Sequence, residues 1–140
     1  MLDRIMLAAA CLVCWPFWGQ AASGPSHQAA LENAVRLGTV ATLAPLCGVR
    51  DEAWSFDLRR AAVMDAIHAP QPDDETLRRF PGQDLATAAL SHAEAEALEA
   101  FAETPAPNTC GPLAHDPEMA RADRIVQAFR LLKAATKPGS

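Results

Sequence analysis

Histidines and carboxylates are the side chains of this sequence that could bind a metal ion or transfer protons. His92 and Glu96 are four residues apart, and Asp65 and His68 are three apart, so on helices each pair would share a face and could contact one metal ion. A protein zinc site takes three or four such ligands, and any third one would have to come from elsewhere in the fold. We therefore predict no metal or other cofactor. His68, His92 and Glu96 are the candidate ligands of an alternative, a His-based metal-binding protein or a sensor of acidic pH.

A hydrolase would need a nucleophile and a base, or paired carboxylates, in one pocket. Ser91 precedes His92 and His115 precedes Asp116, but neighbouring residues on a helix point in different directions. The acidic clusters at 73–75 and 94–99 are typical of solvated helix faces and helix starts. We therefore assign no catalytic residue, and a small hydrolase remains an alternative.

Four cysteines divide into two pairs. Cys11 and Cys14 lie in an apolar N-terminal run, whereas Cys47 and Cys110 lie in the body of the chain. In an oxidising compartment, two distant cysteines most simply form one disulfide. The chain-entropy estimate for so long a loop is roughly 4 kcal/mol of stabilisation. We predict a Cys47–Cys110 disulfide.

Residues 47–54, Cys-Gly-Val-Arg-Asp-Glu-Ala-Trp, form the most distinctive stretch of the sequence. Arg50 and Trp54 belong to the residue types that dominate protein-binding surfaces, so they could form a recognition patch. The competing interpretation is a joint between two helices, with Trp54 as a large core side chain. We favour the joint and keep the patch as a hypothesis.

The first 22 residues have the order of a secretory signal peptide: a weakly basic start, an apolar run and small residues at 19–23. The apolar run, 5–18, has about 14 residues, whereas a bilayer-spanning helix needs about 20. We predict that residues 1–22 are cleaved and that the protein is exported, periplasmic or secreted. An uncleaved membrane anchor is the alternative. Residues 23–140 would then form a single helical domain with a loose tail at 136–140 and no membrane span.

Charge and aromatic content exclude several classes of partner. The formal net charge is −5, which disfavours nucleic acid and anionic lipid surfaces because both select basic patches. The chain has no Tyr, and two of its three Trp residues lie within the predicted signal peptide. A stacking surface for bases is therefore not expected.

The elements that must position these side chains are all helical. Helix caps, apolar spacing and breaks at Pro and Gly predict helices at about 27–44, 52–68, 72–80, 84–103 and 117–135. A Ser91/Glu94 capping box could divide the fourth helix, and 104–114 is predicted as an extended loop. The apolar stripes are expected to bury, among others, Phe56, Ile67, Phe80, Leu98 and Leu132. The fold class is an all-α bundle of four to six helices closed by one disulfide.

No assembled catalytic or cofactor site accompanies the export signal and the Ala-rich helical body. The sequence therefore favours a non-enzymatic exported protein that acts by protein binding or by stabilising clients. Its expected partner is another envelope protein.

Overall fold

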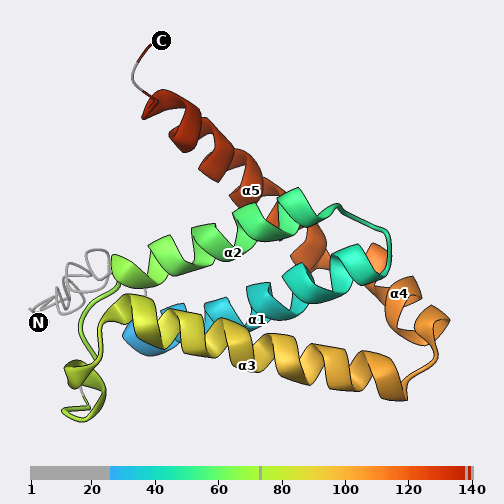
Figure 1. The fold of residues 1–140 in the computed structure, drawn as a ribbon, viewed down its shortest axis with the longest axis horizontal. Helices are drawn as coiled ribbons and strands as arrows, with labels where there is room; N and C mark the ends of the chain where they lie inside the picture. The colour runs from blue at the N-terminus through green and yellow to red at the C-terminus, as the bar shows by residue number, and fades with distance from the viewer. Residues whose placement is uncertain (1–25, 73, 138, 140) are drawn as a thin grey trace, which may run out of the picture.

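The computed structural model describes residues 26–72, 74–137 and 139, and in this part of the chain it contains helices and no strand. The five α-helices and one 3₁₀ turn found there are α1 (His27–Leu46), α2 (Glu52–Ile67), η2 (Leu77–Arg79), α3 (Gly82–Glu103), α4 (Ala106–Ala114) and α5 (Pro117–Ala135) (Figure 1). The predicted all-α class is thus confirmed for these residues. The predicted signal peptide, 1–22, and part of the predicted tail lie outside them.

Three helices begin directly after the residues predicted to be their N-caps, and a local hydrogen bond is present at each. The side chains of Ser26, Asp51 and Asp116 each accept a bond from a backbone N–H in the first turn of α1, α2 and α5. Gly48 has a φ of 66°, the left-handed conformation that favours glycine after a helix. α1 continues through Pro45 and ends one residue later, at Leu46.

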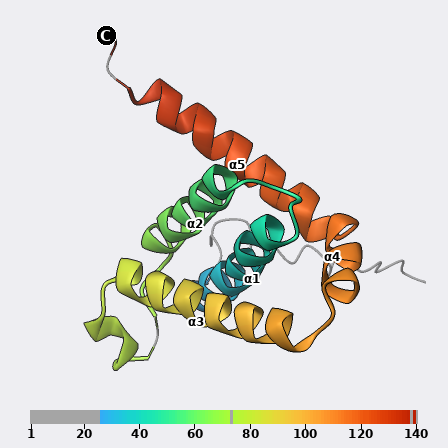
Figure 2. The same cartoon turned by 45° about the vertical axis from the view of Figure 1, so that its right-hand side comes forward.

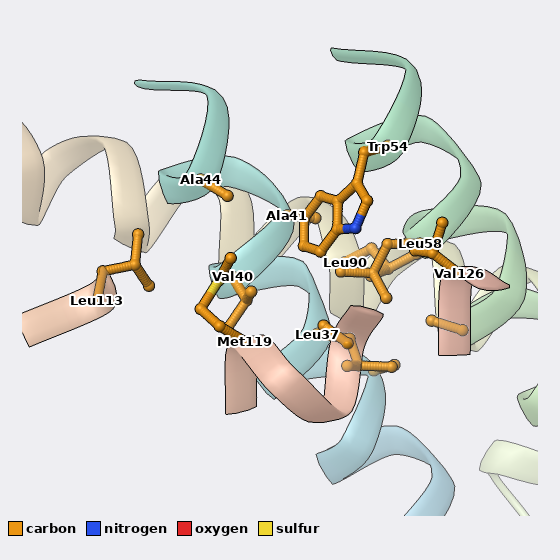
Figure 3. Packing of buried hydrophobic residues seen from close by; sticks show 13 residues of the cluster. Leu37, Val40, Ala41, Ala44, Trp54, Leu58, Leu90, Leu113, Met119 and Val126 are labelled. Atoms are coloured by element: carbon orange, nitrogen blue, oxygen red, sulfur yellow. The ribbon is translucent and has the colours of Figure 1, made fainter. Parts of the chain in front are cut away.

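Helix α1 is the centre of the molecule, packed mainly against α3 and α2 and also in contact with α4 and α5 (Figure 2). Its buried positions are mostly small residues, so neighbouring helices approach it closely. A Cβ on Gly38 would lie 3.0 Å from the Cβ of Ala93 on α3. Leu37 and Leu58 are the largest fully buried side chains, and Trp54, 5% exposed, lies among the core side chains beside Ala41 and Leu58 (Figure 3).

The segment predicted as an extended loop, 104–114, instead contains α4. Pro105 supplies the extended backbone that precedes a helix, and Pro107 lies in the first turn, where no N–H partner is needed. The predicted disulfide joins Cys110 in α4 to Cys47 after α1, with 5.3 Å between the Cα atoms. Leu113 is the buried apolar contact of α4.

One further sequence prediction is wrong. The helix expected at 72–80 is only the three-residue turn η2, because the Asp74 carboxylate accepts from Thr76 N and Leu77 N and so starts a tight turn there. The sequence left open whether 84–103 is one helix or two with a joint at Ser91, and α3 runs unbroken across Ser91. Leu90 and Ala93, on either side of Ser91, are both buried, and this packing holds the helix continuous.

Five apolar side chains predicted to be buried are in fact 44–67% exposed: Phe56, Ile67, Phe80, Leu98 and Leu132. Helical spacing places a residue on a face but does not say how far the neighbouring helix covers that face. The effect is largest on α5, where residues 130–137 are all exposed and the C-terminal end projects past the other helices (Figures 1 and 2). None of the described helices combines the length and the apolarity needed to cross a bilayer.

Candidate functional site

An open groove of about 740 Å³ lies between the projecting half of α5, the second half of α2 and the start of α1. Its walls come from helices that pack together at one end and separate toward the other. The lining residues used below are Asn33, Leu37, Arg60, Met64, Asp65, His68, Arg121, Ile125, Phe129, Leu132 and Lys133. We call this surface the α2/α5 groove.

The floor of the α2/α5 groove is apolar. Leu37 closes it from the core side, and Ile125 and Phe129 are half-buried along α5. Met64 and Leu132, on the two walls, are 48% and 67% exposed. Large apolar side chains left open to water in a hollow are typical of binding surfaces.

The rim of the groove is positive although the whole chain is acidic. Arg60, Arg121 and Lys133 line it, with Asp65 as the one carboxylate among the described lining residues. The formal net charge of the chain is −5. The groove therefore has a local potential opposite in sign to that of the protein as a whole.

Arg60 differs from the other cations of the groove in having no carboxylate beside it among the described residues. Its guanidinium lies over the rings of Phe56 and Phe129, at 5.6 and 6.0 Å from their centroids. Within the described residues, no carboxylate lies within ion-pair distance of it. The apolar wall thus orients Arg60 and leaves its charge uncompensated.

Lys133 and Arg121 differ from Arg60 in how their charges are held. The Lys133 Nζ lies 3.9 Å from the buried Asp57 carboxylate, which already accepts a 2.7 Å bond from Arg130 Nε. Lys133, with a long and weak contact, keeps donors for another acceptor. Arg121 is instead committed to neighbouring side chains.

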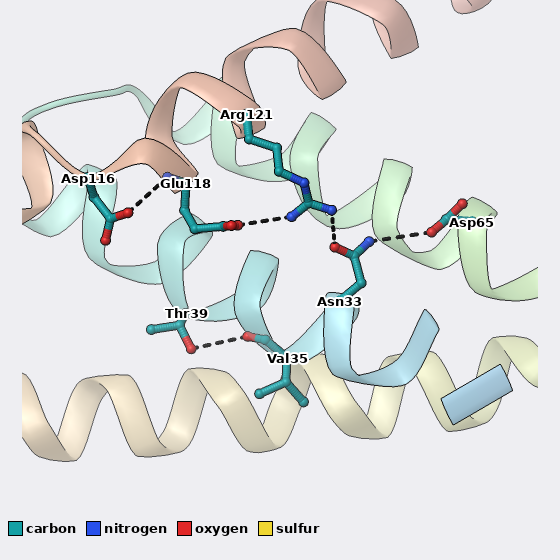
Figure 4. A network of polar contacts seen from close by, with 7 residues as sticks. All are labelled: Asn33, Val35, Thr39, Asp65, Asp116, Glu118 and Arg121. Carbon is teal, nitrogen blue, oxygen red and sulfur yellow. Dashed lines mark hydrogen bonds and ion pairs between the residues drawn. The ribbon is translucent and has the colours of Figure 1, made fainter. Parts of the chain in front are cut away.

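A polar network fixes the end of the groove nearest α1 (Figure 4). Arg121 donates to the Asn33 side-chain oxygen and, at 2.9 Å, to Glu118. The Asn33 amide in turn donates to Asp65 at 3.4 Å. These bonds tie α5 to α1 and α1 to α2, so the walls have a defined spacing before anything binds.

The two residues of the hypothetical recognition patch, Arg50 and Trp54, are both held by Asp123 of α5. Arg50 Nε and Nη2 donate to the two carboxylate oxygens at 2.9 and 2.6 Å, and Trp54 Nε1 donates at 3.0 Å. The bonds from Arg50 lower the pKa of Asp123 and raise that of Arg50, against the opposing effect of burial. Trp54 and Asp123 line a smaller hollow of about 340 Å³ that is separate in its lining from the α2/α5 groove.

The metal candidates are distributed over the fold. His92 Nε2 lies 3.3 Å from Glu96 on exposed α3, and His68 Nδ1 lies 2.7 Å from the Met64 carbonyl at the end of α2. Across residues 26–72, 74–137 and 139, no three His, Cys, Asp or Glu side chains gather in a way that could hold a metal ion.

Comparison with known proteins finds no family model, curated protein or solved structure that matches this chain. What the groove can do therefore rests on its own lining, which combines an apolar floor with a positive rim. Sequence reasoning missed the groove because it assigned Leu132 to the core. The available signal was the pair Leu131-Leu132 beside Lys133 in the last turns of the predicted helix.

Proposed function

We propose that this chain is an exported, non-enzymatic protein that binds an apolar segment of another envelope protein in the α2/α5 groove. The observation that carries the proposal is the open apolar floor between Met64 and Leu132. Soluble proteins rarely leave such side chains together in a hollow unless a partner covers them.

The dimensions favour a peptide segment over a small molecule. On α5 the lining runs from Arg121 to Thr136, which at 1.5 Å per residue is a length of about 22 Å. Pockets for small molecules enclose most of the ligand surface, whereas the outer wall here is a projecting helix end with exposed side chains. An extended groove of this kind suits a helix laid along it.

Export is part of the proposal and is supported by the Cys47–Cys110 bond, because disulfides persist in oxidising compartments. The N-terminal segment 1–22 would supply the signal. Binding of a defined partner and stabilisation of unfolded clients would both use this groove. A protein with one defined partner would bind a single sequence there, whereas a protein that stabilises clients would bind many apolar sequences.

A titration with an uncharged probe tests this function. The probe is a fluorescent 18-residue peptide of Leu, Ala and Gln with one apolar helical face, followed by anisotropy. Leu132→Gln removes an apolar contact, and burial of a Leu side chain contributes about 1.5–3 kcal/mol, so we expect affinity to fall by about tenfold or more.

Leu98→Gln is the matched control, since Leu98 is also an exposed helical leucine but lies on α3, outside the groove. It should leave the affinity unchanged. Failure of the wild-type protein to bind the probe, or equal losses in the two variants, would reject the groove as a binding site.

A further inference from the structure

Resting on the proposed function, we infer that the segment bound in the α2/α5 groove is an acidic amphipathic helix, with an apolar face flanked by carboxylates. The juxtaposition that points to it is an apolar floor edged by Arg60 and Lys133 on a protein that is otherwise negative. A basic or neutral segment would cover these cations without supplying a carboxylate to them.

The two cations belong to the same part of the groove. Arg60 reaches from α2 to the ring of Phe129 on α5, and Lys133 follows Phe129 by one helical turn. Both side chains have donors to spare, whereas Arg121 already donates to Asn33 and Glu118. A carboxylate placed beside the apolar face of a bound helix would meet Arg60, Lys133 or both.

Length and charge argue against two other occupants. About 22 Å of lining matches some four turns of helix. A second copy of α5 would bring its own four cations against those of the groove, namely Arg121, Arg124, Arg130 and Lys133, with only Glu118 and Asp123 to offset them. The apolar segment at 5–18 has no acidic residue to pair with Arg60.

Three matched peptides test the inference. They share the apolar face of the uncharged probe and carry Glu, Gln or Lys at the flanking positions. At low salt we expect the Glu peptide to bind at least about tenfold more tightly than the Lys peptide, with the Gln peptide between them. At about 1 M salt the difference should shrink, because ion pairs at the rim are screened there.

Reversing the charge of Arg60 tests whether this residue causes the preference for the Glu peptide. Arg60→Glu should weaken binding of the Glu peptide and strengthen that of the Lys peptide, and Arg60→Gln should reduce the discrimination without inverting it, because Lys133 remains. Arg79→Glu is the control, because it changes the net charge equally from the exposed turn η2. Far-UV circular dichroism verifies that each variant is folded.

Each other outcome overturns the inference. Equal binding of the three peptides at low salt would reject an acidic partner while leaving the proposed apolar groove intact. Binding of none would reject both. A loss with Arg79→Glu as large as with Arg60→Glu would show an effect of overall charge. Tighter binding of a peptide of residues 5–18, or a dimer in sedimentation velocity that the probe dissociates, would identify the occupant as this chain itself.

Discussion

Replacing Asp123 by Ala should destabilise the protein more than replacing it by Asn, because this carboxylate holds two different partners. It accepts two hydrogen bonds from Arg50 and one from Trp54. Alanine removes both partners' acceptor, whereas asparagine keeps a neutral oxygen for the indole N–H. The comparison therefore separates the ion pair from the hydrogen bond.

The size of the expected loss in unfolding free energy depends on how far each partner of Asp123 is buried. Trp54 is 5% exposed, so an indole N–H without an acceptor costs about 1–2 kcal/mol. The Arg50 and Asp123 side chains are 36% and 40% exposed, and solvent screening limits their ion pair to about 0.5–1 kcal/mol. We expect Asp123→Ala to lower the unfolding free energy by about 2 kcal/mol and Asp123→Asn by about 0.5–1 kcal/mol. At about 4 °C per kcal/mol, the corresponding falls in Tm are about 8 °C and 3 °C.

Urea unfolding followed by circular dichroism measures both values. Arg50→Ala is a second comparison: it leaves the Trp54 bond to Asp123 but removes the ion pair, the Arg50 bond to the Val49 carbonyl and the contact of Arg50 with the Trp54 ring, so it should cost at least as much as Asp123→Asn. If Asp123→Ala costs no more than Asp123→Asn, water satisfies the indole and the reasoning on Trp54 is refuted.

The same carboxylate gives the protein a pH dependence of known sign. The bonds from Arg50 hold the pKa of Asp123 below its ordinary value of 3.8. The folded state therefore favours the ionised form, and its contribution to stability is complete above that value and lost as the pH falls further through the folded pKa. The stability difference between wild type and Asp123→Asn should shrink below about pH 4. A constant difference down to pH 2 would contradict this assignment.

Two further predictions concern the frame of the fold. Cys110→Ser should lower the unfolding free energy by about 2–4 kcal/mol by freeing α4 from the end of α1, and an unchanged urea midpoint would show that the bond contributes nothing. Gly38→Ala should cost about 1–3 kcal/mol because its Cβ would press on Ala93. Gly111→Ala, with open space around it, should stabilise α4 by up to about 1 kcal/mol, and the same sign for both substitutions in urea unfolding would refute the packing argument.

The features that sequence could predict are local. Caps at Asp51 and Asp116 and the left-handed Gly48 depend on hydrogen bonds and backbone angles within a few residues, so each appears where its residue type placed it. The disulfide was predictable for a different reason, since only one pair of cysteines remains outside the N-terminal segment.

The features that sequence could not predict depend on neighbouring helices. Ser91 has the pattern of a helix start, but packing of Leu90 and Ala93 against α1 overrides it. Leu132 continues the apolar period of α5 beyond the last residue that another helix covers. The groove arises because the apolar period of α5 continues past the part of the helix that its neighbours cover. The spacing of apolar residues along a helix does not show where a neighbouring helix stops covering it.

One long-range signal was nevertheless present in the sequence. Arg50 and Asp57 are seven residues apart, as are Asp123 and Arg130, with the charges in the opposite order. Seven residues are about two helical turns, so Asp123 and Arg130 lie on one side of α5, and Arg50 lies two residues before the start of α2, which contains Asp57. The structure joins Arg50 to Asp123 and Asp57 to Arg130.

This pattern agrees with the way α5 lies against α2. Reversing the direction of α5 would place Arg50 near Arg130 and Asp57 near Asp123, so like charges would meet, with the Asp57 side chain only 10% exposed. The two ion pairs therefore favour the parallel arrangement of the two helices and its register. Within the described part of the chain, that register leaves the turns after Arg130 without a covering helix, so residues 130–137 are exposed.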